Sequence, residues 1–284
     1  MNFVQHLLRL YKAHRFAFWA CIALALVLMA LAIQQQAMAK TASFLATMST
    51  CFLLTEFMCF TGGLKFKALS VKQPKVELMI VVLVQVLVIG LLVFWFLIVG
   101  QEVGTGVKIV IGILRLLLAY PIFYLIYFLA IKRYKLKALG FTRFSHWYMA
   151  LPVIVLIGGV SYLFFPEGLQ FEGMLEESGY LSFVTLGFLT AAIPEEITRT
   201  LLHTRLNAVF QHQGVAWFFT SLFWALTHIP SFMANSGDAY GAFIGALGIL
   251  PIGLLWGYLN HRFKSIIPSV LIHGTNLWGL QNIF

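Results

Sequence analysis

Residues 16–34 read FAFWACIALALVLMALAIQ and contain no charged side chain. A helix of this length spans about 30 Å, the thickness of the hydrocarbon core of a bilayer. Over the whole chain of 284 residues, 61% of the side chains are hydrophobic and 10% are charged. This composition excludes a water-soluble globule and predicts an all-α, polytopic transmembrane helix bundle.

Further stretches along the chain have a similar length and apolar character. Each is expected to be helical, because lipid offers the backbone no hydrogen-bond partner. We therefore expect roughly eight or nine spanning helices. The candidate spans lie approximately at residues 16–34, 41–62, 76–99, 107–131, 147–165, 180–200, 214–230, 240–260 and 265–283.

The basic residues indicate how the spans are oriented. They gather at the N-terminus and in alternate connections, whereas the intervening connections are neutral or acidic. By the positive-inside rule, the N-terminus is cytoplasmic. The net charge of +9 thus reflects topology, and no soluble basic module is present that would predict a nucleic-acid partner. Such a compact chain is typical of an integral protein of the bacterial cytoplasmic membrane, with membrane lipid as its surroundings.

The polar residues divide the chain into two parts within one continuous membrane domain. Residues 1–146 have few ionisable groups inside the apolar stretches and are interpreted as scaffold helices. Residues 147–284 contain the unusual polar residues and are interpreted as the functional core. Cys21, Cys51 and Cys59 all fall within apolar stretches, so neither a disulfide framework nor a cysteine zinc site is indicated.

One apolar segment of the core carries two adjacent acids, Glu195 and Glu196, directly after Pro194. Ionisable groups at membrane depth are costly and usually functional. Arg199 lies within one helical turn of both acids, so it can pair with either of them. The pairing would keep one carboxylate charged and leave its neighbour as a general base. The proline is expected to disturb the helix and to make room for water.

Two histidines are placed to join these acids. Glu195 lies 16 residues before a turn near Gln211, and His228 lies 17 residues after it, so an antiparallel helical hairpin puts them at one level. His273, in the last apolar segment, has Asn276 on the same helical face. An imidazole and a carboxamide together can donate hydrogen bonds to a developing oxyanion.

Two other interpretations of these residues remain open. The acids and Arg199 can form an ion pair that only joins two helices, with the histidines as interhelical hydrogen-bonding groups. Alternatively, Glu195, His228 and His273 can bind a divalent metal such as zinc, with an open fourth position for water. A mechanism without a cofactor, in which a glutamate activates the water, is the preferred expectation.

The order of these motifs resembles the family of CAAX prenyl protease 2 and bacteriocin-processing proteins (the CPBP or Abi family), over residues 150–284. The resemblance implies that Glu195 activates water with His228 as its partner. It also implies that His273 and Asn276 stabilise the oxyanion, and that Glu196 and Arg199 position the first carboxylate.

Three positions depart from the family pattern. The arginine that usually follows the second acid by four residues is one residue early, because Thr200 occupies its place. Trp224 replaces a phenylalanine, and the asparagine expected four residues after His273 is Leu277.

The leading hypothesis is an intramembrane endopeptidase that cleaves a membrane-associated peptide or protein. A second is a non-catalytic bacteriocin-immunity or assembly factor that keeps the fold and has lost the reaction. A third is an ion- or proton-coupled transporter that uses the same intramembrane Glu and His residues.

Overall fold

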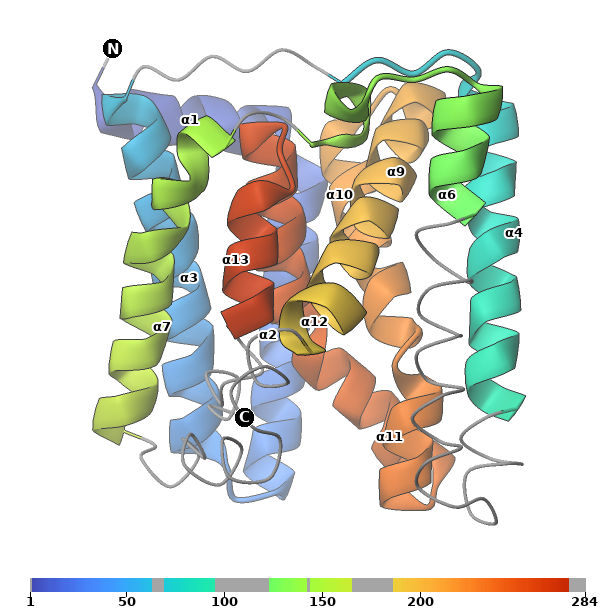
Figure 1. Cartoon of the computed structure of the whole chain (residues 1–284). Helices are drawn as coiled ribbons and strands as arrows, with labels where there is room; N and C mark the ends of the chain where they lie inside the picture. Colours follow the sequence, from blue (N-terminus) through green and yellow to red (C-terminus); the bar gives the residue numbers. More distant parts are fainter. Residues whose placement is uncertain (1, 63–68, 95–122, 142–143, 165–185, 276–284) are drawn as a thin grey trace.

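The computed structural model describes residues 2–62, 69–94, 123–141, 144–164 and 186–275 (Figure 1). Every regular element in these ranges is a helix, which confirms the predicted all-α class. The helices are α1 (Phe3–Ala13), α2 (Arg15–Gln34), α3 (Met38–Thr61), α4 (Pro74–Val93), α6 (Phe123–Leu125), η3 (Ile126–Ile131), η4 (Leu136–Leu139), η5 (Phe144–Met149), α7 (Ala150–Phe164), η7 (Leu186–Ala192), α9 (Ile193–Phe210), α10 (Gln213–Leu226), α11 (Ile229–Ser236), α12 (Ala239–Phe263) and α13 (Ile267–Thr275).

Five described stretches are long and apolar enough to cross a membrane. They are Arg15–Gln34, Met38–Thr61, Pro74–Leu91, Trp147–Phe164 and Ala239–Phe263. The predicted spans at 107–131, 180–200 and 265–283 lie partly outside the described residues. An integral membrane protein is therefore supported, and the total of eight or nine spans stays a prediction.

The predicted span at 214–230 is two helices instead of one. α10 ends at Leu226, and α11 begins at Ile229 with Pro230 in its first turn. Proline fits the first turn of a helix because the backbone N–H that it lacks would have no partner there. The break leaves His228 at the junction of the two helices, as the N-cap of α11.

The predicted hairpin before this break is confirmed. α9 ends at Phe210, and Gln211 adopts the left-handed conformation with φ 54° that reverses the chain into α10. α9 and α10 then pack side by side. Glu195 starts the first helix of the pair, and His228 follows the second, so the hairpin brings both toward the middle of the bundle.

Helix α12 lies at the centre of this arrangement (Figure 1). It packs against α3, α9, α10, α11 and α13. Of its most apolar window, 61% is buried, whereas the other four candidate spans are 22–39% buried. Its glycines allow the close approach: Ser221 and Trp217 lie against Gly257, and Trp224 lies against Gly253.

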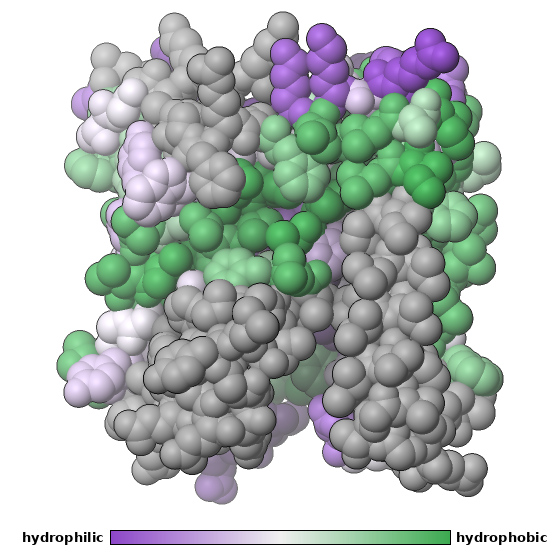
Figure 2. Space-filling model, in the orientation of Figure 1, coloured by the Kyte–Doolittle hydropathy of each residue, from purple (hydrophilic) through white to green (hydrophobic). Residues whose placement is uncertain are grey.

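Helix α1 lies across one end of the bundle, the upper end in Figure 1. Figure 2 shows an apolar band over the described part of this face, with hydrophilic residues above it. The lysines of two loops meet at this end, because Lys72 donates to the carbonyl of Lys132 and Lys132 donates to Gln73. This is the end that the positive-inside rule assigns to the cytoplasm.

Two buried ion pairs join helices near the same end. Glu77 Oε2 of α4 lies 3.0 Å from Arg205 Nη2 of α9, and neither side chain is exposed. Glu56 Oε1 of α3 lies 2.6 Å from Arg262 Nε of α12, and Glu56 Oε2 also bonds His6 Nε2. Removing one partner of such a pair leaves a buried charge and costs about 3–5 kcal/mol, so these pairs hold the scaffold helices against the core.

Candidate active site

The two acids stand at a change of helix type. The π-helix η7 ends at Ala192, and α9 continues as an α-helix with Pro194 in its first turn. A π-helical stretch is wider than an α-helix and is frequent at functional sites. The proline was expected to disturb the helix, and the irregular backbone is indeed located directly before it. Glu195 and Glu196 thus lie in the first α-helical turn after the π-helix.

Glu196 is fully buried and has three partners. Arg199 Nε donates to its two carboxylate oxygens at 3.2 and 3.1 Å, as expected for one of the two acids. Asn260 Nδ2 of α12 donates to Oε2 at 2.6 Å. His273 Nδ1 of α13 lies 3.1 Å from Oε1. Glu196 therefore ties α9, α12 and α13 together through charge-assisted bonds.

Arg199 completes this buried network from the other side. Its Nη1 donates to the carbonyl oxygen of Gly253 at 3.1 Å. Its guanidinium carbon lies 4.4 Å from the ring centre of Trp224 and 5.7 Å from that of Trp256. Cation–π contacts of this kind strengthen when water is excluded. The guanidinium thus supports Glu196 and fixes the indole of Trp224.

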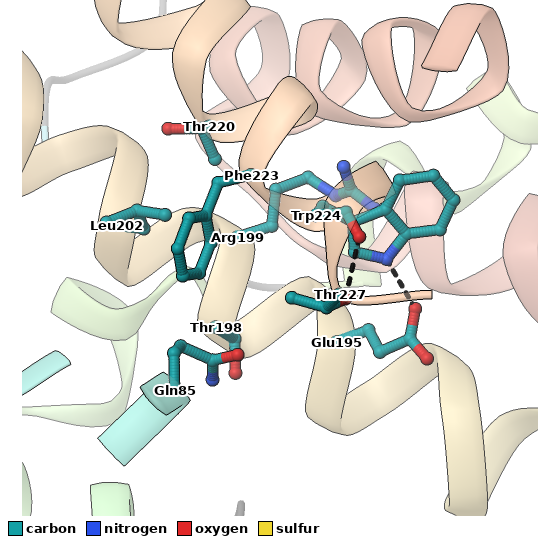
Figure 3. Close-up of a pocket in the computed structure, with 9 residues that line it drawn as sticks. All are labelled: Gln85, Glu195, Thr198, Arg199, Leu202, Thr220, Phe223, Trp224 and Thr227. Carbon is teal, nitrogen blue, oxygen red and sulfur yellow. Dashed lines mark hydrogen bonds between the residues drawn. The ribbon is translucent and has the colours of Figure 1, made fainter. Parts of the chain in front are cut away.

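Glu195 has a different environment, with 22% of its side chain exposed. Trp224 Nε1 donates to its Oε2 at 2.5 Å (Figure 3). The same oxygen lies 3.7 Å from His273 Nε2. Beside the carboxylate is a cavity of about 20 Å³, lined also by Thr198 and Thr227. That is room for roughly one water molecule among polar groups.

His273 is held between the two acids. Its ring stacks on Trp256 with the centroids 3.8 Å apart and the planes 16° from parallel. Nδ1 faces Glu196 and Nε2 faces Glu195. The aromatic stack and the carboxylate bond together leave the ring one orientation, with Nε2 directed to the exposed acid.

His228 lies on the other side of Trp224. Its Nδ1 is 3.0 Å from the carbonyl oxygen of Trp224, and the two ring centroids are 4.6 Å apart. A carbonyl only accepts, so Nδ1 is the donor in this contact. Its described bonds run to Trp224 and Thr227, and Trp224 links it to Glu195.

The structure therefore brings Glu195, Glu196, Arg199 and His273 into one connected site, with His228 one ring away. Asn276 lies outside the described residues. Glu196 and Arg199 were expected to position Glu195; their described polar contacts run to His273, Asn260 and Gly253, and Arg199 also packs on Trp224, which bonds Glu195, so this role stays a prediction. Among the residues described, no three His, Cys, Asp or Glu side chains form a group that could hold a metal ion.

Sequence reasoning missed three residues of this site. Asn260 is a carboxamide within an otherwise apolar span, and an intramembrane polar residue of that kind is a usable signal. Ser269 of α13 donates to its Oδ1 and orients the amide. Trp256 carried no signal, because a tryptophan in a membrane helix is ordinary and its stacking on His273 depends on the packing of α12 against α13.

Comparison with known proteins identifies one family whose sequence pattern matches part of this chain. The family described as type II CAAX prenyl endopeptidase Rce1-like matches residues 177–278, a range that includes Glu195, His228 and His273. The match confirms the resemblance to CAAX-type proteases, and it supports a membrane endopeptidase with a peptide substrate. No curated protein and no solved structure gives a significant match.

Proposed function

We propose that this chain, whose residues 177–278 belong to the Rce1-like family of CAAX endopeptidases, hydrolyses a peptide bond of a membrane-associated substrate with water that Glu195 activates. One observation carries the proposal: Glu195 lines a cavity with room for one water, and its Oε2 lies 3.7 Å from His273 Nε2. Glu195 is the exposed acid of the pair and can reach a substrate, whereas Glu196 is enclosed.

Glu195 acts as the general base in this mechanism. Its carboxylate takes a proton from the water while the water oxygen attacks the scissile carbonyl carbon. The indole N–H of Trp224 holds the carboxylate in place. When the tetrahedral intermediate collapses, the C–N bond breaks and Glu195 returns the proton to the leaving nitrogen. The carboxylate is thereby regenerated for the next turnover.

His273 supplies the oxyanion donor. Because Nδ1 faces the carboxylate of Glu196, it carries the first proton of the ring. A second proton on Nε2 then makes the ring a charged donor that points to the reacting centre. Glu196 compensates the positive charge of that ring, and Arg199 in turn compensates Glu196. In this mechanism Glu196 and Arg199 are positioning residues for His273, and Asn276 is the second oxyanion donor by resemblance.

His228 is the second partner of the water. With its Nδ1 proton directed to the carbonyl of Trp224, it presents Nε2 as an acceptor. A neutral imidazole of this tautomer can accept a hydrogen bond from the attacking water. Trp224 contacts both His228 and Glu195, so the two groups approach the reacting centre from opposite sides of one indole ring.

The proposed chemistry needs no metal ion. Glu195, His228 and His273 are the donors that a zinc site would use, and they form no metal-binding group in this arrangement. His228 turns Nδ1 to a backbone carbonyl, and His273 turns Nδ1 to Glu196. Activation by the carboxylate alone uses the contacts that are present.

The proposal is tested in cells that express the wild type or Glu195→Gln at equal levels. New peptide termini in the membrane proteome are scored for both. Termini that occur only with the wild type support proteolysis and identify the substrate. The matched control is Asp238→Asn, which removes a carboxylate at the exposed N-cap of α12 while keeping a good capping residue. Asp238→Asn should produce the same termini as the wild type.

The opposite result is equally informative. If wild-type and Glu195→Gln membranes carry the same termini, hydrolysis by Glu195 is wrong. Flux in sealed vesicles that disappears in Glu195→Gln would then favour the transporter. A cellular phenotype that survives Glu195→Ala would favour the non-catalytic partner.

A further inference from the structure

A second polar pocket lies at the basic end of the bundle, between α9 and α12 and beside the start of α10. Its volume is about 230 Å³. It is separate from the cavity beside Glu195, and the two share no lining residue. The residues that line it are Leu69, Val71, Thr200, His203, Thr204, Asn207, Ala208, Gln213, Asn260, His261 and Lys264.

The lining is basic and polar. Lys264 Nζ lies 3.1 Å from His261 Nδ1, and the rings of His203 and His261 are 5.0 Å apart. No aspartate or glutamate is among the described residues that line it. The nearby Arg262 is already paired with Glu56, whereas the described ion pairs include none for Lys264. The pocket therefore has positive charge without a carboxylate to balance it.

Buried polar atoms in this lining also lack partners. His203 is 7% exposed and Thr200 is 3% exposed. His203 Nε2 and Thr200 Oγ1 make no hydrogen bond among the described residues. Leaving a buried polar atom unpaired costs about 1–3 kcal/mol, so a ligand that bonds these atoms has a stabilising effect that the protein alone does not provide.

We propose that this pocket binds a phosphate-type oxyanion, with Lys264 and Thr200 as donors. The ligand is a phosphate group, from a phosphomonoester lipid headgroup or from free phosphate. The ammonium group of Lys264 disfavours a metal cation at the same place, and the described His, Cys, Asp and Glu residues form no metal-binding group there. The pocket adjoins the end of the candidate span Ala239–Phe263, where lipid headgroups lie.

The charges around the pocket predict how binding depends on pH. Burial and the neighbouring Arg262 lower the pKa of Lys264 to about 8. Burial, Lys264 and His14 lower the pKa of His203 to about 3, against a hydrogen bond with the Gln213 backbone. Affinity should therefore fall as the pH rises through 8. The titratable and charged groups around these two residues are His14, His261 and Arg262, and His14 is in turn affected by His212 and Glu56.

The test uses the full chain purified in detergent, with sulfate as the first probe. Sulfate is a tetrahedral dianion that does not titrate near neutral pH, so any pH dependence belongs to the protein. Binding is measured by calorimetry at constant ionic strength, set with chloride. The variants are Lys264→Gln and Thr200→Val, and the matched control is Lys137→Gln, an exposed lysine outside the pocket lining.

We expect sulfate to bind Lys137→Gln as tightly as it binds the wild type. The same should hold for inorganic phosphate. Loss of the charge-assisted bond should weaken binding about tenfold or more in Lys264→Gln, and loss of a neutral hydroxyl bond should weaken it roughly threefold in Thr200→Val. Equal binding by all four proteins, or none by the wild type, overturns the proposal. The source of the phosphate group is then identified with mixed micelles that contain phosphatidic acid. Tighter binding of phosphatidic acid than of inorganic phosphate indicates a lipid headgroup, and the reverse indicates free phosphate. The readout is binding, so it stands apart from the outcome for peptide cleavage.

Discussion

Glu196 Oε1 lies 3.1 Å from Nδ1 of His273, although the two residues are 77 positions apart in the chain. The bond crosses from α9 to α13 and turns Nε2 of the ring toward Glu195. The two adjacent acids thereby have separate tasks, because one holds the imidazole and the other faces the cavity.

The first prediction concerns the stability that Glu196 provides. Glu196→Gln leaves the buried Arg199 without its counter-charge, and the free energy of unfolding should fall by about 3–5 kcal/mol. Glu195→Gln should change it by less than about 1 kcal/mol, because that side chain is partly exposed. Denaturant titration of the purified variants measures both, and equal losses would contradict the separation of tasks.

The second prediction tests whether the Glu196–Arg199 pair acts as a unit. In the double variant Glu196→Gln/Arg199→Met, neither buried charge remains without its partner. The loss of stability should therefore be smaller than the sum of the two single losses, by about 0.5–3 kcal/mol. The same titrations give this coupling energy. Additive losses would show that the two side chains act independently.

The third prediction concerns the close approach of α12 to Trp224. A Cβ at Gly253 would lie 2.5 Å from Trp224 Cε3, so Gly253→Ala must displace the indole that bonds Glu195. We expect a loss of about 1–3 kcal/mol in stability together with a loss of cleavage. The matched control is Gly248→Ala in the same helix, where a Cβ would meet nothing within 4 Å. That variant should be as active as the wild type.

The fourth prediction is a loss of stability in mild acid. Burial lowers the pKa of His203 to about 3, whereas the unfolded chain protonates it near the ordinary value of 6.5. The unfolded state therefore binds more protons between these values, and stability falls as the pH falls. From pH 7 to pH 5 the loss from this group is roughly 2 kcal/mol. Thermal unfolding at both pH values measures it.

A neutral side chain at the same position provides the control. His203→Gln should reduce the difference between pH 7 and pH 5 by that amount. If the variant shows the full difference, His203 is not the group responsible.

The helical class and the α9–α10 hairpin could be predicted from the sequence. Both follow from local signals: apolar length for the helices, and the equal spacing of Glu195 and His228 about Gln211 for the hairpin. The break before α11 also had a local signal, because Pro230 disfavours a continuous helix through the preceding residue. The expectation of one continuous span gave more weight to apolar length than to that proline.

The resemblance predicted separate roles for the two acids, but the contacts of each could not be predicted from their spacing. Arg199 is within reach of both on a helix, and only the packing of α12 and α13 decides that Asn260 and His273 meet Glu196. The stacking of Trp256 on His273 depends on the same tertiary contact. Such contacts join residues far apart in the chain, where periodicity and spacing carry no information.

The hairpin also sets a sequence of events during synthesis. Glu195 and Trp224 meet as soon as α9 and α10 close, but His273 is made 77 residues after Glu196. At about 5–20 residues per second, the ribosome needs roughly 4–15 s to add that length. Until α13 docks, Glu195 lacks the imidazole of His273. On the proposed mechanism, an unfinished copy therefore cannot cut the proteins that are being inserted into the membrane beside it.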